Sequence, residues 1–355
     1  MNALEAELDY PFADALPEPG RKRAIAPGVW WIRMPLPFAL DHINLWLLRD
    51  RYDGRDGWTV IDCGVGLEAT RDLWRQVLRN ELDGLPIVRI LCTHTHPDHL
   101  GNAAWLIEET STDPAPPLWM TLGEYTMGRV LQAALPGTDG PGIVAHYTMH
   151  GLTDPTHLAK LGERTGYFGK LVPAVPHAFR RIVDGERITI GDDTWRVITG
   201  FGHSPEHAAL YAERARILIS GDMLLPRIST NVSVHATEPE ANPVQQFLDS
   251  IDRFTPLPED TLVLPSHGRP FRHLHRRVEQ LHEHHDARLG EVFDACAKKP
   301  CTAGDIVPIM FKRELDSHQM FFAFGEALAH LHALWYAGRV GRERGADRVY
   351  RFVAH

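Results

Sequence analysis

The stretch Pro86–Leu100, PIVRILCTHTHPDHL, places a group of potential metal ligands directly after a continuous apolar run. Residues 86–93 have the pattern of a strand covered on both faces, and a helix is expected over 100–110. Open α/β layers place their functional sites at the carboxyl ends of such strands. Three imidazoles and one carboxylate suit zinc or another first-row metal rather than magnesium or calcium. The pattern between strand and helix is HxHxDH, formed by His94, His96, Asp98 and His99.

Three further potential ligands each follow a predicted strand. His203 comes after ITGFG, Asp222 after ILISG and His267 after LVLPS. Four separate strand ends therefore deliver ligand-type residues, a convergence that chance does not readily produce.

The ordered set HxHxDH…H…D…H resembles that of the metallo-β-lactamase-fold superfamily, in its hydrolase branch with a glyoxalase II-like dinuclear metal set. The resemblance covers about residues 25–275. It implies an α/β fold, a four-layer αβ/βα sandwich with the metals in a cleft at one edge. It also implies two zinc ions, or iron or manganese in their place. One ion would be held by His94, His96 and His203, the second by Asp98, His99 and His267, with Asp222 bridging the two.

Two further residues match supporting positions in this superfamily. Asp62, in VIDCG, corresponds to an aspartate that holds the metal-ligand loop from behind, although a strand-end turn is an alternative role. The family's HTPGH stretch is HSPEH here, over residues 203–207. Its last residue, His207, is expected to support the ligands by hydrogen bonding rather than to bind metal.

The chemistry implied is hydrolysis by a metal-bridging hydroxide. Two ions about 3.5–4 Å apart can share a hydroxide, because coordination lowers the pKa of water to about 7. Asp98 and Asp222 are the expected catalytic residues, with Asp98 handling the proton after attack on a carbonyl or phosphorus centre. The sequence contains no GxSxG elbow, P-loop or Rossmann glycine fingerprint, so serine-nucleophile, NTPase and nicotinamide alternatives have no support.

Three functions fit this ligand set. A hydrolase of a small-molecule ester, lactone or thioester is favoured; the alternatives are a phosphodiesterase or endoribonuclease and a mononuclear iron sulfur dioxygenase. True β-lactamases generally lack the bridging aspartate, so Asp222 counts against that activity. Flavin-linked diiron members have glutamate in place of His96, which counts against them. A non-catalytic binding module is disfavoured because all seven ligands are present.

Stretches rich in proline and glycine, together with changes in composition, divide the chain into three predicted parts. Residues 1–24 form an acidic extension, 25–275 the catalytic domain, and 276–355 a C-terminal unit. DPAPP, LPGTDGPG and VPAVP mark an insertion at about 112–186, in which at most two helices are expected. Three helices and a hairpin in the last unit follow the winged-helix order, with a lid or dimerisation element as the alternative.

Candidate substrate contacts are weaker. PRISTNVSV, over 226–234, comes shortly after Asp222, and its Arg227 and Asn231 are candidates for holding a substrate anion. Tyr147 and His150 in the insertion are further candidates. The chain has 21 histidines, and those in LHEHHDARL, over 281–289, are expected at the surface.

Charge and patterning restrict the partners. With 37 Lys+Arg and 46 Asp+Glu, the net charge is −9, which disfavours nucleic acid and anionic membranes. The helix expected over 317–337 has no Lys or Arg, and its aromatic face predicts packing on the catalytic domain or a second subunit. We expect a small-molecule substrate and a homodimer. The sequence has no membrane-length apolar run, signal-peptide pattern or CxxC pair, which predicts a cytoplasmic protein.

Overall fold

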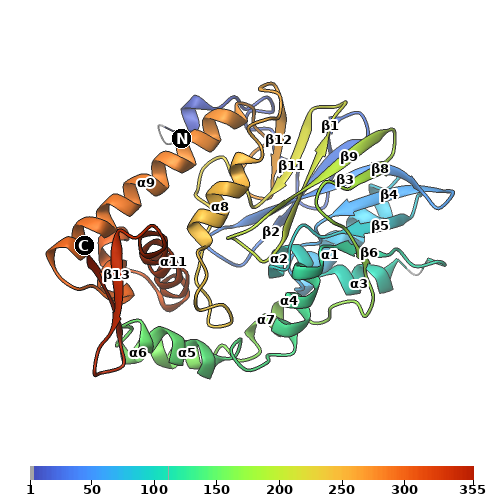
Figure 1. Ribbon diagram of the computed structural model, residues 1–355. Coiled ribbons are helices and arrows are strands. Elements are labelled where there is room, and N and C mark those ends of the chain that lie inside the picture. The colour runs from blue at the N-terminus through green and yellow to red at the C-terminus, as the bar shows by residue number, and fades with distance from the viewer. Residues whose placement is uncertain (1–3, 111) are drawn as a thin grey trace.

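Two β-sheets lie face to face in the computed structural model, which describes residues 4–110 and 112–355 (Figure 1). The first sheet has seven strands in chain order: β1 (Arg23–Ala26), β2 (Val29–Pro35), β3 (His42–Tyr52), β4 (Arg55–Ile61), β5 (Ile87–Leu91), β6 (Leu118–Met120) and β7 (Arg180–Arg181). The second has five, in the order β12-β11-β10-β9-β8: β8 (Arg187–Ile190), β9 (Asp193–Gly200), β10 (His207–Ala212), β11 (Ile217–Gly221) and β12 (Leu262–Pro265).

Apolar side chains from both sheets form one core between them, with Trp31 and Trp46 on one side and Trp195 and Leu264 on the other. The outer face of the first sheet is covered by α1 (Glu68–Asn80) and α3 (Ala103–Glu109), and that of the second by α8 (Pro243–Asp252) and α9 (Leu274–Lys298). Helix, sheet, sheet and helix give the four-layer αβ/βα sandwich that the sequence predicts.

The strand β5, IVRIL, is buried along its whole length and pairs in parallel with β4 and β6. A parallel strand in the middle of a sheet is covered on both faces, which explains its near-continuous apolar pattern. It leads into α2 (Pro97–Leu100), so the histidine-rich stretch lies between the end of a central strand and a helix start.

The insertion differs from the prediction in two ways. It holds four helices rather than two: α4 (Leu122–Gln132), α5 (Gly140–Met149), α6 (Pro155–Gly162) and α7 (Tyr167–Leu171). The two helices expected near residues 123–135 and 152–165 correspond to α4 and α6, so α5 and α7 are the additional ones. Pro141, in the LPGTDGPG stretch interpreted as a break, stands in the first turn of α5, where proline is favoured, behind the N-cap residue Asp139. Moreover, β6 and β7 extend the main sheet, so residues 112–186 are not a separate unit throughout; strands of two or three residues leave little periodic signal.

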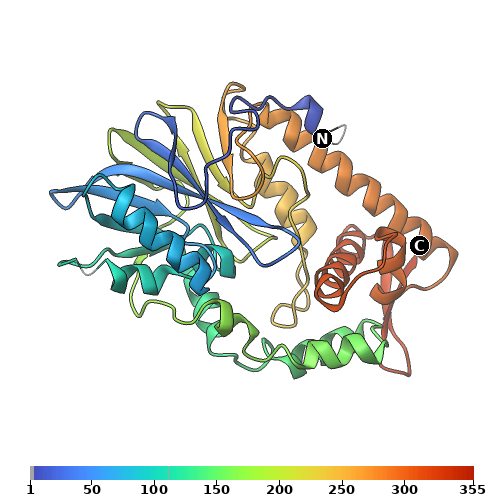
Figure 2. The same ribbon diagram turned by 180° about the vertical axis from the view of Figure 1, so that it is seen from behind.

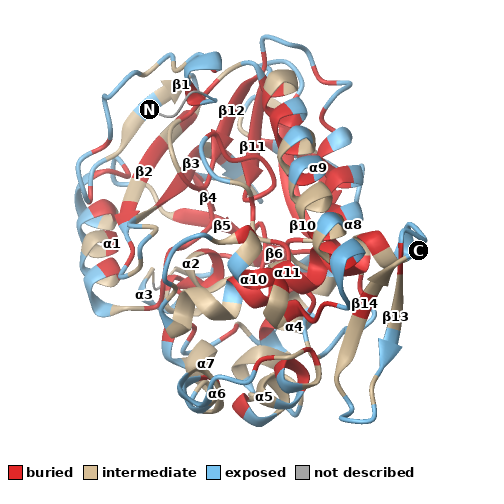
Figure 3. Ribbon diagram, turned by 90° about the vertical axis from the view of Figure 1, so that its left-hand side faces the viewer, coloured by how far each residue is buried: buried red, intermediate tan, exposed pale blue. Residues whose placement is uncertain are grey.

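The C-terminal unit has the predicted order of three helices and a hairpin, namely the long helix α9, then α10 (Ala303–Met310), α11 (Ser317–Tyr336), β13 (Val340–Arg344) and β14 (Tyr350–Ala354). The apolar face of α11 packs on α6, α8, α9 and α10 of the same chain. Figure 3 shows this helix in the buried colour at the centre of its unit. This face was expected to pack on the catalytic domain or on a second subunit, and it packs within its own chain. The homodimer therefore stays a prediction.

Two further expectations need correction or refinement. His285, expected at the surface, is fully buried on α9 and lies 3.1 Å from His330 of α11, because α9 is covered by other helices on that side. The described part of the N-terminal extension begins with η1 (Glu5–Glu7) and runs beside α9, as Figure 2 shows. Its Leu8 is buried, and Glu7 pairs with Arg276.

No helix among the described residues combines the length and the apolar character needed to cross a membrane.

Candidate metal centre

The seven residues predicted as ligands lie together at the ends of four strands. Two groups can be distinguished, because the candidate ligand atoms within each lie within 4.8 Å of one another. His94 and His96 follow β5, while Asp98 and His99 begin α2. The first group consists of His94, His96, His203 and Asp222, and the second of Asp98, His99 and His267.

The carboxylate of Asp222 lies between the two groups. Its Oδ2 is 3.3 Å from Nε2 of His203 and 3.9 Å from Nε2 of His94. Its Oδ1 faces the other way, at 3.4 Å from Nε2 of His267 and 3.6 Å from Nε2 of His99. Ligands at about 2.1 Å from one tetrahedral zinc ion are about 3.4 Å apart. Each oxygen therefore has the spacing of a ligand to a different ion.

The remaining distances agree with the same grouping. In the first group, Nε2 of His94 lies 2.9 Å from Nδ1 of His96 and 3.3 Å from Nε2 of His203. In the second, Oδ2 of Asp98 lies 3.4 Å from Nε2 of His267 and 3.7 Å from Nε2 of His99.

Two of these atoms are buried without a hydrogen-bond partner among the described residues: Nε2 of His99 and Oδ1 of Asp222. A buried polar atom without a partner is costly, and most such atoms in native proteins are paired or bound to an ion. Coordination of a metal would satisfy both. The donor set of imidazoles and carboxylates, its spacing and its unsatisfied atoms thus fit a pair of first-row metal ions.

In four of the candidate ligand histidines, Nδ1 lies within hydrogen-bond distance of a neighbouring oxygen atom. This contact orients the ring so that Nε2 points toward the centre. Nδ1 of His203 bonds the carbonyl of Asn231 and Nδ1 of His267 that of His42, both at 2.8 Å. Nδ1 of His99 lies 2.8 Å from Asp62, and Nδ1 of His94 lies 3.1 Å from Oγ1 of Thr93. His42, which the sequence analysis did not identify, also accepts the backbone N–H of Gly268 at its Nε2 (2.8 Å).

Asp62 has the contacts expected of a supporting residue. It is buried; its Oδ1 accepts the backbone N–H of Thr93, and its Oδ2 accepts the Thr93 hydroxyl and faces Nδ1 of His99. Its φ is +61°, a left-handed conformation that costs a non-glycine residue about 1–3 kcal/mol. Asp62 therefore fills both expected roles: it forms the turn at the strand end, and it supports the loop that carries the candidate ligands.

His207 also lies behind the ligands. It is the first residue of β10, is fully buried, and accepts the backbone N–H of Asp222 at Nε2 over 3.2 Å. Gly221, at φ +55°, allows this contact, because a Cβ added there would collide with the His207 ring.

Glu124 is a second supporting residue, besides His42, that the sequence analysis did not identify. It lies on α4 in the insertion, is fully buried, and accepts three hydrogen bonds from the loops that carry His94, His96 and His203. The donors are the N–H of Thr95 (2.9 Å), the hydroxyl of Ser204 (2.6 Å) and the N–H of Glu206 (2.7 Å). Burial raises the pKa of this carboxyl, against the effect of the hydrogen bonds. No local motif surrounds Glu124, so only the folded chain reveals its role.

The ionised carboxylates of the centre favour the binding of cations. Burial alone would raise the pKa of Asp98, but the nearby His99 and His267 lower it to about 2, so the carboxylate is ionised at neutral pH. Burial, together with the nearby His203, lowers the pKa of His96 to about 3, so this imidazole is neutral at neutral pH. Ionised carboxylates and neutral imidazoles are the forms that bind metals. Against the effect of burial, the carboxylates of Asp222 and Asp98 raise the pKa of His267 to about 10, so a metal ion bound there would displace the proton of this imidazole.

The four weaker substrate candidates have other contacts. Arg227 is exposed and faces Glu5 at 3.9 Å, because its loop turns outward toward the N-terminal segment. Asn231 contributes its carbonyl to His203, while its amide donates to Glu326 over 3.3 Å. Tyr147 donates to the carbonyl of Phe321, and His150 stacks on Tyr350. The contacts of Tyr147 and His150 connect the insertion to the C-terminal unit instead of to the ligands.

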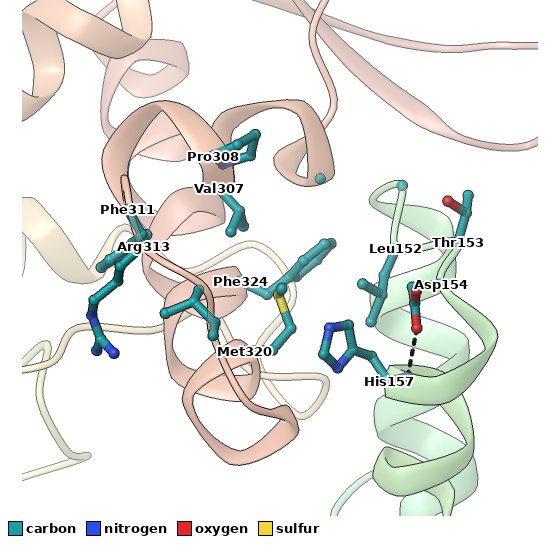
Figure 4. Close-up of a pocket in the computed structure, with 13 residues that line it drawn as sticks. Leu152, Thr153, Asp154, His157, Val307, Pro308, Phe311, Arg313, Met320 and Phe324 are labelled. Atoms are coloured by element: carbon teal, nitrogen blue, oxygen red, sulfur yellow. Dashed lines mark hydrogen bonds between the residues drawn. The ribbon is translucent and has the colours of Figure 1, made fainter. Parts of the chain in front are cut away.

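A separate pocket of about 350 Å³ lies between α6 and the C-terminal helices (Figure 4). Met320 and Phe324 of α11 line it opposite Leu152 and His157. None of the seven candidate ligands lines this pocket.

Comparisons with known proteins agree with this geometry. Residues 39–267 match the metallo-beta-lactamase superfamily, and residues 289–355 match the metallo-beta-lactamase-like C-terminal domain. A solved beta-lactamase domain protein from Burkholderia ambifaria is 56% identical, with a TM-score of 0.94 and 100% of both chains covered.

Two curated relatives carry names that describe an activity. The "probable metallo-hydrolase YqjP" of Bacillus subtilis (strain 168) is 25% identical over 316 residues, which is 85% of this chain and 91% of that protein. The acyl-coenzyme A thioesterase MBLAC2 of Gallus gallus is 28% identical over 206 residues, 57% of this chain and 65% of that protein. From the match over most of its length, the chain belongs to the metallo-β-lactamase superfamily.

Proposed function

We propose that this chain is a dinuclear metal-dependent hydrolase, with zinc as the expected metal, that cleaves the thioester or ester of a small acyl compound. The observation that carries the proposal is the position of Asp222, whose two oxygens face the two histidine groups at 3.3–3.9 Å. A carboxylate in this position can bridge two ions, whereas one ion would use only one of the groups.

Bound metal ions would supply an acidified water molecule and a positive charge that polarises the scissile carbonyl. The residues of the chain supply orientation and proton transfer. Asn231 and His42 hold the rings of His203 and His267 through their carbonyls. Asp98, ionised at neutral pH, accepts a proton from the attacking water. Water adds to the carbonyl carbon, the carbon–sulfur or carbon–oxygen bond breaks, and the proton passes to the departing atom.

The choice of an acyl substrate has its own support. The relative from Gallus gallus is named an acyl-coenzyme A thioesterase, and it matches 57% of this chain. The α11 helix, which would be the recognition helix of a nucleic-acid-binding winged helix, has its apolar face packed inside the same chain and carries no Lys or Arg. These observations favour an acyl compound over a nucleic-acid phosphodiester.

Initial rates on one metal-quantified preparation test this proposal. The substrates are an acyl-coenzyme A thioester series, a lactone and bis-p-nitrophenyl phosphate. We expect faster turnover of an acyl substrate, and a loss of at least about 100-fold in Asp222→Asn. Asp260→Asn, which changes an exposed aspartate paired with Arg216, is the matched control and retains the wild-type rate. Turnover of the phosphodiester alone would overturn the choice of substrate, and wild-type rates in Asp222→Asn would overturn the bridging role.

A further inference from the structure

Four aromatic rings from three distant parts of the chain meet at His318, near the start of α11. The ring of Phe38, from the loop between β2 and β3, stacks on His318 at 5.8 Å with an angle of 11°. Tyr167, the first residue of α7, lies 6.5 Å from the same ring, and Phe322 lies 5.1 Å from it. The cluster of Phe38, Tyr167, His318 and Phe322, here called the aromatic cluster, exists only in the folded chain.

The segment that carries Phe38 is anchored beside one candidate ligand. Its loop leads into His42, whose carbonyl accepts Nδ1 of His267 and whose Nε2 accepts the N–H of Gly268, both at 2.8 Å. One side of the aromatic cluster is therefore fixed next to the His267 side of the metal centre.

The segment that carries Tyr167 is anchored on another side. The helix α7 packs against α2, which holds Asp98 and His99. At the end of α7, the carbonyl of Leu171 accepts the backbone N–H of Gly66 at 2.8 Å, in the loop that follows Asp62.

The segment that carries His318 and Phe322 is anchored on the third side. Further along α11, Glu326 accepts the amide of Asn231, whose carbonyl holds His203. The carbonyl of Gly325 accepts the N–H of Val234 at 3.4 Å. The three anchors thus connect the segments of the aromatic cluster to residues that hold or adjoin His267, Asp98 and His99, and His203.

The aromatic cluster is apolar, partly open to solvent and firmly held. Phe322 is 37% exposed, and the other three rings are half-buried. Arg164 lies over the rings of Tyr167 and Phe321 at 4.6 and 4.3 Å, which fixes Tyr167 against α11. The opposite face of α11 is directed elsewhere, since Met320 and Phe324 line the separate pocket of Figure 4. Partly exposed rings next to a functional centre are typical of a binding surface.

We propose that the aromatic cluster binds the apolar acyl group of the substrate, at least several carbons long, while its carbonyl lies at the metal centre. This inference rests on the proposed function and deepens it. The polar side chains at the centre would hold the ions, and the aromatic cluster offers an apolar surface to the carbon chain. Each buried methylene tightens binding by about fourfold, so a chain of several carbons is held far more tightly than acetyl.

Equilibrium binding tests the inference without turnover. Octanoate and acetate, the free acids of long and short acyl groups, are titrated by calorimetry into the full-length, metal-quantified protein. We expect octanoate to bind at least about tenfold more tightly than acetate, and Phe322→Ala to weaken octanoate binding about tenfold. The matched control is Tyr336→Ala, which removes an exposed ring from the other end of α11 and keeps octanoate affinity. Equal affinity for the two acids, or for octanoate in Phe322→Ala and wild type, would overturn the inference.

Turnover separates the inference from the proposed function. The readout is the ratio of kcat/KM for octanoyl over acetyl thioester, which we expect to fall about tenfold in Phe322→Ala. If octanoate binding depends on Phe322 but no thioester is hydrolysed, the acyl-binding role of the aromatic cluster stands and the proposed reaction is wrong. Thioester hydrolysis with the same ratio in both proteins would keep the reaction and reject the cluster.

Discussion

Asp62 directs both of its carboxylate oxygens at residues that carry or orient the candidate ligands. One oxygen accepts the N–H of Thr93 at 2.7 Å, and the other lies 2.8 Å from Nδ1 of His99. A histidine whose Nδ1 donates to a carboxylate presents Nε2 as a more basic ligand. Asp62 therefore acts on the metal centre entirely through residues that touch it.

Replacing Asp62 tests this indirect role. Asp62→Asn places an amide against Nδ1 of His99, which disturbs the ring orientation, so metal affinity should fall about 10- to 100-fold. Competition with a chelator of known affinity measures the change. The control, Asp184→Asn, changes an aspartate that pairs with Arg253 instead. Unchanged metal affinity in Asp62→Asn would show that His99 is oriented by other contacts.

Glu124 gives a second prediction for a single residue. Glu124→Gln places an N–H against one of the donors Thr95, Ser204 and Glu206, and leaves a buried polar group unpaired. The free energy of unfolding of the metal-free protein should fall by about 1–3 kcal/mol. Chemical denaturation of metal-free samples measures it, with the exposed Glu259→Gln as the control. Equal stability of the two variants would argue against the role of Glu124 in joining the two loops.

At the scale of elements, the contact between α9 and α11 contains a buried pair of histidines. Burial, together with the nearby His330, lowers the pKa of His285 to about 2, and burial lowers that of His330 to about 4. The ordinary value of 6.5 applies to the unfolded chain, so below pH 6.5 the unfolded state binds more protons than the folded state. The two residues therefore contribute stability that is complete above pH 6.5 and is lost as the pH falls toward the folded pKa values.

This pH dependence can be isolated with one substitution. For a histidine that stays neutral in the folded state, the loss between about pH 7.5 and pH 5 is about 2 kcal/mol. His285→Gln removes one titrating group, so the difference in unfolding free energy between the two pH values should shrink by roughly that amount. The control, His282→Gln, changes a partly exposed histidine on the same helix, paired with Asp252. The same pH difference in His285→Gln and wild type would contradict the assignment.

Which elements could be predicted depended on how much local signal each carries. The buried run of β5 and the three-helix-and-hairpin order of the C-terminal unit have strong local patterns, and the structure contains them. The helix α5 was missed because a proline stands in its first turn, and proline marks both a helix start and a break. The helix α7 was missed because its five residues are too few to show a helical period. β6 and β7 owe their place in the sheet to backbone pairing with neighbours that sequence periodicity does not show.

At the scale of the whole molecule, one part of the candidate site could be predicted from the sequence and another part could not. The seven candidate ligands each end a strand or begin a helix, so their chemistry and position were visible in the sequence, and the structure brings them together. The contacts behind them come from distant segments: Glu124 from the insertion, His42 from the β2–β3 loop and Glu326 from the C-terminal unit. Arg227 was misplaced for the same reason, since proximity to Asp222 in sequence did not fix its direction.

These contacts make the insertion and the C-terminal unit part of the site. Through Asn231, Glu326 reaches the carbonyl that holds His203. Arg277 of α9, fully buried, donates to the carbonyls of Leu225 and Ile228, in the loop that follows Asp222. The positions of His203 and of the loop that follows Asp222 thus depend on contacts with the C-terminal unit.

The most direct test of this account is the number of metal ions bound per chain. Metal-free wild-type protein and Asp222→Asn are each titrated with zinc, and bound metal is measured by elemental analysis after removal of the excess. We predict two tightly bound ions per wild-type chain and fewer than two in Asp222→Asn, because the side chain that joins the two groups loses a charged oxygen. One ion in the wild type, or two held equally tightly by Asp222→Asn, would contradict the assignment of Asp222 as the bridge of a dinuclear centre.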